Sequence, residues 1–234
     1  MLQPQLNSLF DSQAASYDAR WAKTAPIRDA LYLLLDSLFI GLPADARILA
    51  VGVGTGTELA ALAASHPGWR FTAVEPSGAM LEQCRARAER EGFADRCTFH
   101  LGTTDTLPAG EPYDAATCFL VSQFILDPTA RSGFFADIAA RLKPGGLLAS
   151  SDLASDTTSP EYDTLLHAWV AMMSSAGLTA EAVENLRNAY TKDVAVIPTA
   201  RIEAIIRGGG FEQPTLFYQA GLIHAWRSQK AFET

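Results

Sequence analysis

From strand to helix the chain reads Ile48-Leu49-Ala50-Val51-Gly52-Val53-Gly54-Thr55-Gly56. An apolar run of strand length leads into three glycines at alternate positions, which leave the backbone N–H groups free to approach a ligand closely. The apolar spacing of residues 57–65 predicts a helix directly after them, and the positive end of a helix attracts anionic or polar groups. The stretch therefore indicates a nucleoside-binding turn, with a purely structural strand-to-helix turn as the alternative.

The position of the third glycine separates two classes of cofactor. A dinucleotide-binding loop has the pattern G-x-G-x-x-G, which with Gly52 and Gly54 requires a glycine at position 57. Thr57 stands there, and the third glycine is Gly56. A nicotinamide-dependent oxidoreductase is therefore disfavoured.

A carboxylate ends the next predicted strand, residues 70–75. Glu75 stands at the carboxyl end of that strand, where its side chain can accept hydrogen bonds from both hydroxyls of a ribose that lies across the strand ends. A solvated charge before Pro76 is the alternative. Because Glu75 follows the glycine turn at the spacing of a nucleoside site, the sequence favours ribose binding.

Strands and helices alternate along most of the chain. Five predicted strands are separated by helices with short links: 47–51, 70–75, 97–101, 114–120 and 147–152. This alternation is typical of a doubly wound α/β sheet whose strands are mostly parallel. Two closing runs, 215–219 and 222–227, are too close together for a crossover helix, so we expect them to form an antiparallel hairpin.

Two segments fall outside this alternation. Residues 1–42 predict a helical cover, and residues 153–207 predict a helical cap, both placed over the ligand site of a single domain, 1–234. Within the first segment a cluster of leucines predicts a helix that faces the core. Its members are Leu31, Leu33, Leu34, Leu35 and Leu38.

Composition limits the class of protein. The chain has 234 residues, of which 48% are hydrophobic, so it can form a packed core. Its net charge of −8 disfavours nucleic acid as a direct partner. The three cysteines form no CxxC pair, which indicates a reducing cytosol and neither a disulfide framework nor a metal site. The N-terminus lacks the pattern of a signal peptide, and no apolar run is long enough to cross a bilayer.

Five segments resemble the class I S-adenosylmethionine-dependent methyltransferases. They are ILAVGVGTG (48–56), AVEPS (73–77), HLGTTDTLP (100–108), YDAATCFLVSQFI (113–125) and IAARLKPGGLLASSDL (138–153). FDSQAASYDARW (10–21) is similar to the N-terminal helix that covers the donor site in small-molecule members. The resemblance implies a seven-stranded sheet with a closing hairpin and S-adenosylmethionine as the cofactor.

The same resemblance assigns cofactor-binding residues. The glycines of the first segment border the methionine part, Glu75 holds the ribose, and residues after the third and fourth strands lie near the adenine and the sulfonium. The residues implied are Gly52, Gly54, Gly56, Glu75, Pro76, Met80, Gly102, Thr103, Thr104, Phe119, Leu120, Val121, Tyr17 and Arg20. Many members carry Asp where this chain has Thr103. Met80, Phe119 and Leu120 could equally be core residues.

One position departs from the family pattern. The first motif usually has an acidic residue where this chain has Ala50. The acid's role is therefore lost or supplied by another group. Glu58, in the first turn of the following helix, is one candidate, although it could simply be a favourable helix N-terminal charge. Tyr17 and Arg20 are the other candidates.

The methyl acceptor is less well specified. Transfer from a sulfonium needs alignment and exclusion of water more than acid–base groups, so no catalytic residue is identified. Candidates for a base are His167, Tyr162 and Asp152, whereas His100 and His224 are expected to be structural. Candidates for substrate contact are Gln123, Trp169 and Arg187. We expect a small-molecule acceptor, no membrane partner, and a monomer or homodimer.

A subgroup resemblance gives an alternative activity. SQFILDPTARSGFF (122–135) and the region 182–211 are similar to parts of the carboxy-S-adenosylmethionine synthases, and Arg187 falls where that subgroup has an arginine that holds the added carboxylate. The chain would then act on the cofactor itself. A non-catalytic nucleoside-binding protein is a further alternative, because Ala50 weakens the first motif.

Overall fold

The computed structural model describes residues 3–173 and 179–232, which contain one seven-stranded sheet of order β3-β2-β1-β4-β5-β7-β6. The strands are β1 (Arg47–Val51), β2 (Arg70–Glu75), β3 (Cys97–Leu101), β4 (Tyr113–Phe119), β5 (Leu142–Leu153), β6 (Phe211–Ala220) and β7 (Ile223–Lys230). β1 to β5 pair in parallel, and β7 pairs antiparallel with both β5 and β6. The predicted doubly wound sheet with its antiparallel hairpin is confirmed.

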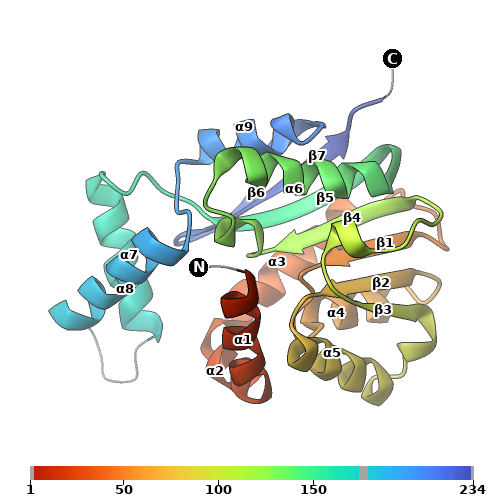
Figure 1. Ribbon diagram of the computed structural model, residues 1–234, viewed down its shortest axis with the longest axis horizontal. Helices are drawn as coiled ribbons and strands as arrows, with labels where there is room; N and C mark the ends of the chain where they lie inside the picture. Colours follow the sequence, from red (N-terminus) through yellow and green to blue (C-terminus); the bar gives the residue numbers. More distant parts are fainter. Residues whose placement is uncertain (1–2, 174–178, 233–234) are drawn as a thin grey trace.

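Helices cover both faces of the sheet (Figure 1). One face carries α3 (Ala25–Leu38), α4 (Thr57–Ser65) and α5 (Gly78–Arg90), and the other carries α6 (Pro128–Arg141) and α9 (Thr199–Gly208). β5 begins at Leu142, earlier than the predicted start at Leu147, because Leu142 pairs with Tyr113 before a register shift. The predicted Pro-Gly-Gly turn therefore lies inside an irregular strand.

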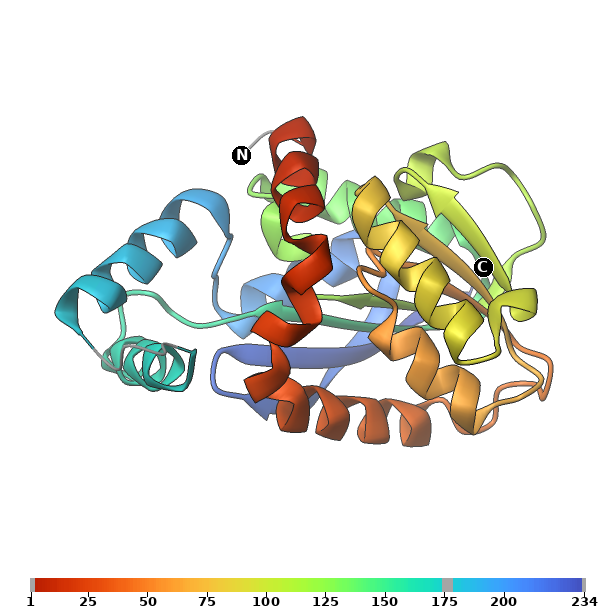
Figure 2. The same ribbon diagram turned by 90° about the horizontal axis from the view of Figure 1, so that it is seen from below.

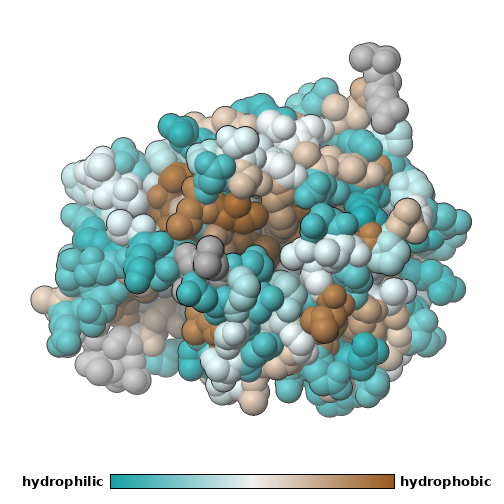
Figure 3. Space-filling model, viewed as in Figure 1, coloured by the Kyte–Doolittle hydropathy of each residue, from teal (hydrophilic) through white to brown (hydrophobic). Residues whose placement is uncertain are grey.

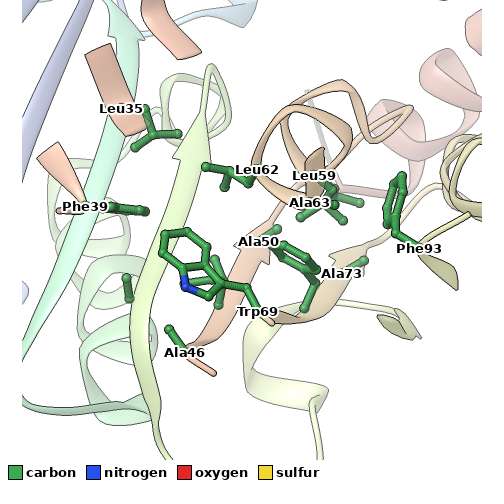
Figure 4. Packing of buried hydrophobic residues seen from close by; sticks show 14 of the residues in the cluster. Leu35, Phe39, Ala46, Ala50, Leu59, Leu62, Ala63, Trp69, Ala73 and Phe93 are labelled. Atoms are coloured by element: carbon green, nitrogen blue, oxygen red, sulfur yellow. The ribbon is translucent and has the colours of Figure 1, made fainter. Parts of the chain in front are cut away.

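One part of the core lies between α3, α4, α5 and the sheet. Figure 4 shows Leu35 from α3, Phe39 directly after α3 and Leu62 from α4 around the indole of Trp69. The alanines of the central strands, such as Ala50 and Ala73, have no exposed surface, and their small side chains let the helices pack closely on the sheet.

The leucine cluster of the N-terminal segment is only partly buried. Leu31 and Leu35, one helical turn apart, face the core. Leu33 and Leu34 are 71% and 40% exposed, so the prediction that they face the core is wrong. A helix that packs on one sheet face can bury only one stripe of its side chains, and this cluster spans more than one stripe.

An N-terminal segment crosses the carboxyl ends of the strands. It consists of α1 (Gln3–Gln13), a 3-10 turn η1 (Ala14–Ser16) and α2 (Tyr17–Arg20), followed by η2 (Ala22–Thr24); we call Gln3–Arg20 the cover. In Figure 2 the cover passes between α5 on one side and α7 and α8 on the other. The predicted cover, 1–42, also includes α3, which packs on the sheet, and residues 1–2, which lie outside the described residues.

Two helices stand apart from the sheet. α7 (Pro160–Met173) and α8 (Ala180–Asp193), which we call the cap, share a hydrophobic cluster with the ends of β5 and β7. This cap cluster contains Leu153, Tyr162, Leu166, Trp169, Val170, Val183, Val196, Leu222 and Ile223. The predicted cap, 153–207, was too long at its end, because α9 packs on α6 and β6. Residues 174–178 of that segment are outside the described part of the chain.

Within residues 3–173 and 179–232, no helix has both the length and the apolar character that a bilayer crossing needs.

Candidate functional site

The candidate site lies where the strand order reverses. β1 has β2 on one side and β4 on the other, so the chain connections leave in opposite directions and open a crevice at the carboxyl ends of these strands. Gly52 follows β1, Pro76 follows β2 and Leu120 follows β4. Leu120 has a left-handed backbone with φ of 58° and is held by two hydrogen bonds from its N–H to Ser151. Strain of this kind in a non-glycine residue is common at functional sites.

Glu75 connects the turns that follow β1 and β2. Its Oε2 accepts a hydrogen bond from the N–H of Gly54, and its Oε1 accepts one from the N–H of Ser77, both at 2.9 Å. Burial raises the pKa of this carboxyl, although the two N–H groups oppose the shift. Each oxygen keeps a second lone pair. Glu75 can thus bind ribose hydroxyls and hold the glycine turn in place simultaneously.

The three glycines of the turn have different surroundings. A side chain at Gly52 would collide with Val121, and one at Gly56 would collide with Cys84 of α5. A Cβ at Gly54 would meet nothing within 4 Å. The open space for a ligand therefore lies over Gly54, while Gly52 and Gly56 permit close packing of the protein on itself.

Two carboxylates of the cover bind the walls of the site. Asp11 Oδ1 accepts hydrogen bonds from the hydroxyl of Ser77 at 2.6 Å and from the N–H of Ala79 at 3.1 Å, at the start of α5. These bonds lower the pKa of Asp11. Asp18 accepts from Thr55 Oγ1 at 2.7 Å and pairs with Arg87 of α5. The cover is therefore attached to the glycine turn through Thr55 and to α5 at its start and along its length.

Aromatic rings line the inner side of the cover. Phe10 packs edge-on against Phe124, in the 3-10 turn η5 (Ser122–Phe124) after β4, with 5.6 Å between ring centroids. Tyr17 lies 6.4 Å from Phe10 and 6.2 Å from Trp21. Burial and then the charge of Glu75 raise the pKa of Tyr17, so its phenol is near the proposed ribose carboxylate. Arg20 is exposed.

Glu58 brings a carboxylate to the position where the family acid is missing. Its Oε1 accepts a hydrogen bond from Thr117 Oγ1 at 2.5 Å. Thr117 is the β4 partner of Ala50. Glu58 is only 6% exposed, and burial raises its pKa to about 7. It is therefore a buried group under the site and not a solvated charge at a helix end.

A buried ion pair fixes the turn after β4. Arg131 of α6 and Asp152 of β5 lie 3.0 Å apart and are 1% and 0% exposed. Ser122 donates to Asp152 and accepts from Arg131 Nε. Burial raises the pKa of Asp152, against the effect of Arg131. Asp152 is thus closed off from any methyl acceptor, and the expectation that it is a candidate base is corrected.

Gln123 belongs to the same support. It is 5% exposed, and its Oε1 accepts from the N–H of Leu153 while its backbone oxygen accepts from the N–H of Ala195. The expectation that Gln123 faces the substrate is therefore corrected. Sequence reasoning missed Arg131, although one signal was present. Arg131 shares a helical stripe with Phe135 and Ile138, and a charged residue on an apolar stripe needs a buried partner.

The candidate residues of the cap are mostly engaged within the cap. Tyr162 is 1% exposed, and the guanidinium of Arg187 lies 5.4 Å from the centre of its ring. Arg187 also pairs with Asp163 at 2.8 Å. Trp169 is buried in the cap cluster, and His167 is exposed on α7. Tyr162 is therefore not accessible as a base, and the charge of Arg187 is already paired.

Some of the residues expected beside an adenine are accessible at the edge of the site, and others are buried. Pro76, Gly102 and Thr103 are half-buried at the edge of the site. Met80 and Thr104 are 2% exposed, so the side chain of Thr104 points into the protein and that of Met80 belongs to the core. Thr103 begins the 3-10 turn η4 (Thr104–Thr106) and forms a capping box with Thr106. His100 bonds Thr106 at 2.9 Å and His224 bonds Leu222 at 3.0 Å, in agreement with structural roles.

Apolar surface gathers near this end of the sheet. Figure 3 shows it around a hollow near the middle of the face, over the region where β4 ends and α6 begins. Leu126 is 44% exposed there, and Phe124 and Ile125 are half-buried. Such a surface suits a ligand with an apolar body.

Comparison with known proteins identifies the central part of the chain. Residues 48–146 match a family model described as a methyltransferase domain. This part of the chain is a methyltransferase domain. Its first motif, the Glu75 strand and the turn after β4 all lie inside the matched range, in agreement with the predicted S-adenosylmethionine-dependent methyltransferase family and its cofactor.

Curated relatives and solved structures that resemble this chain agree with the match to a methyltransferase domain. The chain is 30% identical to a demethylmenaquinone methyltransferase of Clavibacter sepedonicus, over 64% of this chain and 59% of that protein. It is 29% identical to a carboxy-S-adenosyl-L-methionine synthase of Dichelobacter nodosus, over 67% of this chain and 63% of that protein. An O-methyltransferase family protein from Burkholderia thailandensis has the same fold, with a TM-score of 0.62 at 14% identity over 99% of this chain and 61% of that chain. The chain spans less than two thirds of each relative.

Proposed function

We propose that the chain is an S-adenosylmethionine-dependent methyltransferase that acts on a small-molecule acceptor in the cytosol. The observation that carries the proposal is the arrangement of Glu75 and Gly54. One carboxylate, bound to the glycine turn at 2.9 Å, lies at the switch point of the sheet beside open space. That is the arrangement in which a nucleoside can bind across the strand ends.

The residues of the site fit this cofactor. Glu75 would bind the ribose, the space over Gly54 would take the methionine part, and Leu120 and Val121 would lie under the sulfonium. S-adenosylmethionine, when bound, supplies a methyl group that is already activated for transfer. The cover, attached through Asp11 and Asp18, would exclude water from that methyl group, so alignment and desolvation are the contributions that we expect from the protein.

Glu58 is proposed as the replacement for the missing acid at position 50. Its carboxylate reaches the same level of the sheet from α4, through the hydroxyl of Thr117. Because the carboxylate is buried, we expect it to order the glycine turn from below. The alternative, synthesis of a carboxylated cofactor, has less support, because the charge of Arg187 is paired with Asp163.

Binding and transfer test the proposal separately. S-adenosylhomocysteine at about 100 times its Kd should add roughly 2.7 kcal/mol to the free energy of unfolding, seen as a higher Tm. Transfer is then tested with radiolabelled S-adenosylmethionine and a panel of alcohols, phenols and amines, followed by mass spectrometry. NADH is the control ligand and should leave the Tm unchanged. No shift with S-adenosylhomocysteine would refute the assignment of the site.

A further inference from the structure

The four tryptophans of the chain differ in what their indole N–H groups meet. Trp69 donates to the backbone oxygen of Pro43 at 3.0 Å, and Trp226 donates to Glu203 at 3.4 Å. Trp169 shares a hydrogen bond with Tyr190. The indole nitrogen of Trp21 is buried, yet it has no hydrogen-bond partner among the residues that the structure describes.

Trp21 stands where three parts of the protein meet. It directly follows α2 at the end of the cover, with its ring 6.2 Å from that of Tyr17. The ring packs against the cap cluster. Leu120, the strained residue directly after β4, packs against the same cluster. Trp21 therefore lies at the end of the cover, against the same cap cluster that Leu120 contacts at the carboxyl end of β4.

An unpaired buried donor is unusual. Leaving an N–H group without an acceptor inside a protein costs free energy, and most buried polar groups in folded proteins are paired. The ring atoms of Trp21 have apolar neighbours from the cap cluster, which would strongly disfavour a charged ligand. The partner that fits is a neutral oxygen on a largely apolar molecule.

We propose that the indole N–H of Trp21 binds the methyl acceptor and selects it. The acceptor would be a neutral, mainly apolar molecule with a hydroxyl or carbonyl oxygen that accepts this hydrogen bond. This inference rests on the proposed methyltransferase function and adds the chemical class of its substrate. A site that is built to pair with a substrate oxygen discriminates strongly against analogues that lack it.

Nuclear magnetic resonance of the full chain, labelled with ¹⁵N in its tryptophans and in its glycines, provides the test. The indole signal of Trp21 is assigned with the Trp21→Phe variant, and probes are added with and without S-adenosylhomocysteine. The probes form two pairs, and the members of each pair differ mainly by an oxygen. The pairs are acetophenone with ethylbenzene, and 2-naphthol with 2-methylnaphthalene. We expect both oxygen-bearing probes to move the Trp21 indole proton downfield to saturation, and the hydrocarbons to leave it near its free position.

Variants separate binding from folding. Trp21→Phe should weaken the oxygen-bearing probes about tenfold, the loss of one neutral hydrogen bond, and leave hydrocarbon binding unchanged. It should also keep the Tm close to that of the wild type, because no protein partner loses a bond. The matched control Trp69→Phe, which breaks the bond to Pro43, should lower the Tm and leave probe binding intact.

Two results would overturn the inference. One is an indole proton of Trp21 that responds to neither oxygen-bearing probe while S-adenosylhomocysteine shifts the amide of Gly54. The other is an equal loss of affinity for both members of a pair in Trp21→Phe. If S-adenosylhomocysteine fails to shift the amide signal of Gly54, that result would instead refute the proposed function. The indole signal of Trp21 is a separate measurement, so the two failures can be distinguished.

Discussion

Glu58 Oε1 lies 2.5 Å from Thr117 Oγ1, directly beside Ala50, which is the strand partner of Thr117. A carboxylate from a helix thus occupies the neighbourhood where related proteins carry an acid on the strand itself. The substitution is possible because Ala50 is small and α4 packs over it. Burial of the carboxylate has a measurable consequence for stability.

The stability of the protein should depend on pH through Glu58. The pKa of this group rises from 4.5 in the unfolded chain to about 7 in the folded protein. Its contribution is therefore fully present below pH 4.5 and is lost as the pH rises through 7. We expect Glu58→Gln to be more stable than the wild type at pH 8, by up to about 3 kcal/mol, and similar at pH 4.

Urea unfolding of both proteins at several pH values measures this difference. Glu82→Gln is the control, because Glu82 is an exposed glutamate on α5 and its loss should not change the pH profile. Parallel pH profiles for Glu58→Gln and the wild type would contradict the assignment.

Restoring the acid of the family pattern should destabilise this chain. Ala50→Asp places a second carboxyl group beside Glu58 in a position without exposed surface, and we expect a loss of about 3 kcal/mol or more. Combining it with Glu58→Ala should recover part of that loss, since the remaining carboxyl group can then bond Thr117. A double-mutant cycle by urea unfolding measures the coupling. Strictly additive effects would show that the two positions do not share one role.

The glycines of the first motif should respond differently to alanine. Gly54→Ala meets open space, so we expect about 1 kcal/mol of backbone strain from its positive φ and a weaker affinity for S-adenosylhomocysteine. Gly56→Ala collides with Cys84 and should cost about 2–4 kcal/mol through added overpacking. Thermal unfolding and calorimetric titration separate the two effects. Equal destabilisation by both variants is the result that would argue against this division of roles.

Glu75 should be required for cofactor binding. Glu75→Gln replaces one acceptor oxygen with an NH₂ group, which only donates hydrogen bonds. The two side-chain atoms of the variant therefore cannot both accept hydrogen bonds, as the two oxygens of Glu75 do from the N–H groups of Gly54 and Ser77. We expect the Kd for S-adenosylhomocysteine to rise by about 10- to 100-fold, since hydrogen bonds to a charged group contribute about 1.5–3 kcal/mol. Isothermal titration calorimetry gives the value, with Glu82→Gln as the exposed control. Unchanged affinity would refute the ribose assignment.

The cover should loosen when its two carboxylates are neutralised. Asp11→Asn with Asp18→Asn weakens the attachments to Ser77 and Arg87, so limited proteolysis should cut the first 24 residues faster. S-adenosylhomocysteine should also dissociate faster, because we propose that the cover closes the site. Asp29→Asn, at an exposed position on α3, is the control and should behave as the wild type. An unchanged cleavage rate in the double variant would be evidence against these attachments.

Periodicity and spacing were sufficient to predict the sheet. The strand-length runs and the Gly52–Gly56 turn predict a parallel α/β unit because side-chain alternation and glycine conformation are local properties of the chain. Likewise, the short link before Ile223 requires an antiparallel hairpin. Glu75 could be placed at the site because parallel strands end at the same edge of a sheet.

Pairing between distant residues needed the tertiary structure. Burial of a charged side chain depends on what packs against it, so neither the closed pair of Arg131 and Asp152 nor the contact of Glu58 with Thr117 follows from local patterns. Leu31 and Leu35 of α3 are buried and Leu33 is exposed for the same reason: the face of the helix that packs on the sheet is decided by tertiary contacts. Which N–H groups stay unpaired is decided only when all segments are in place, and this is why Trp21 could not be found from the sequence alone.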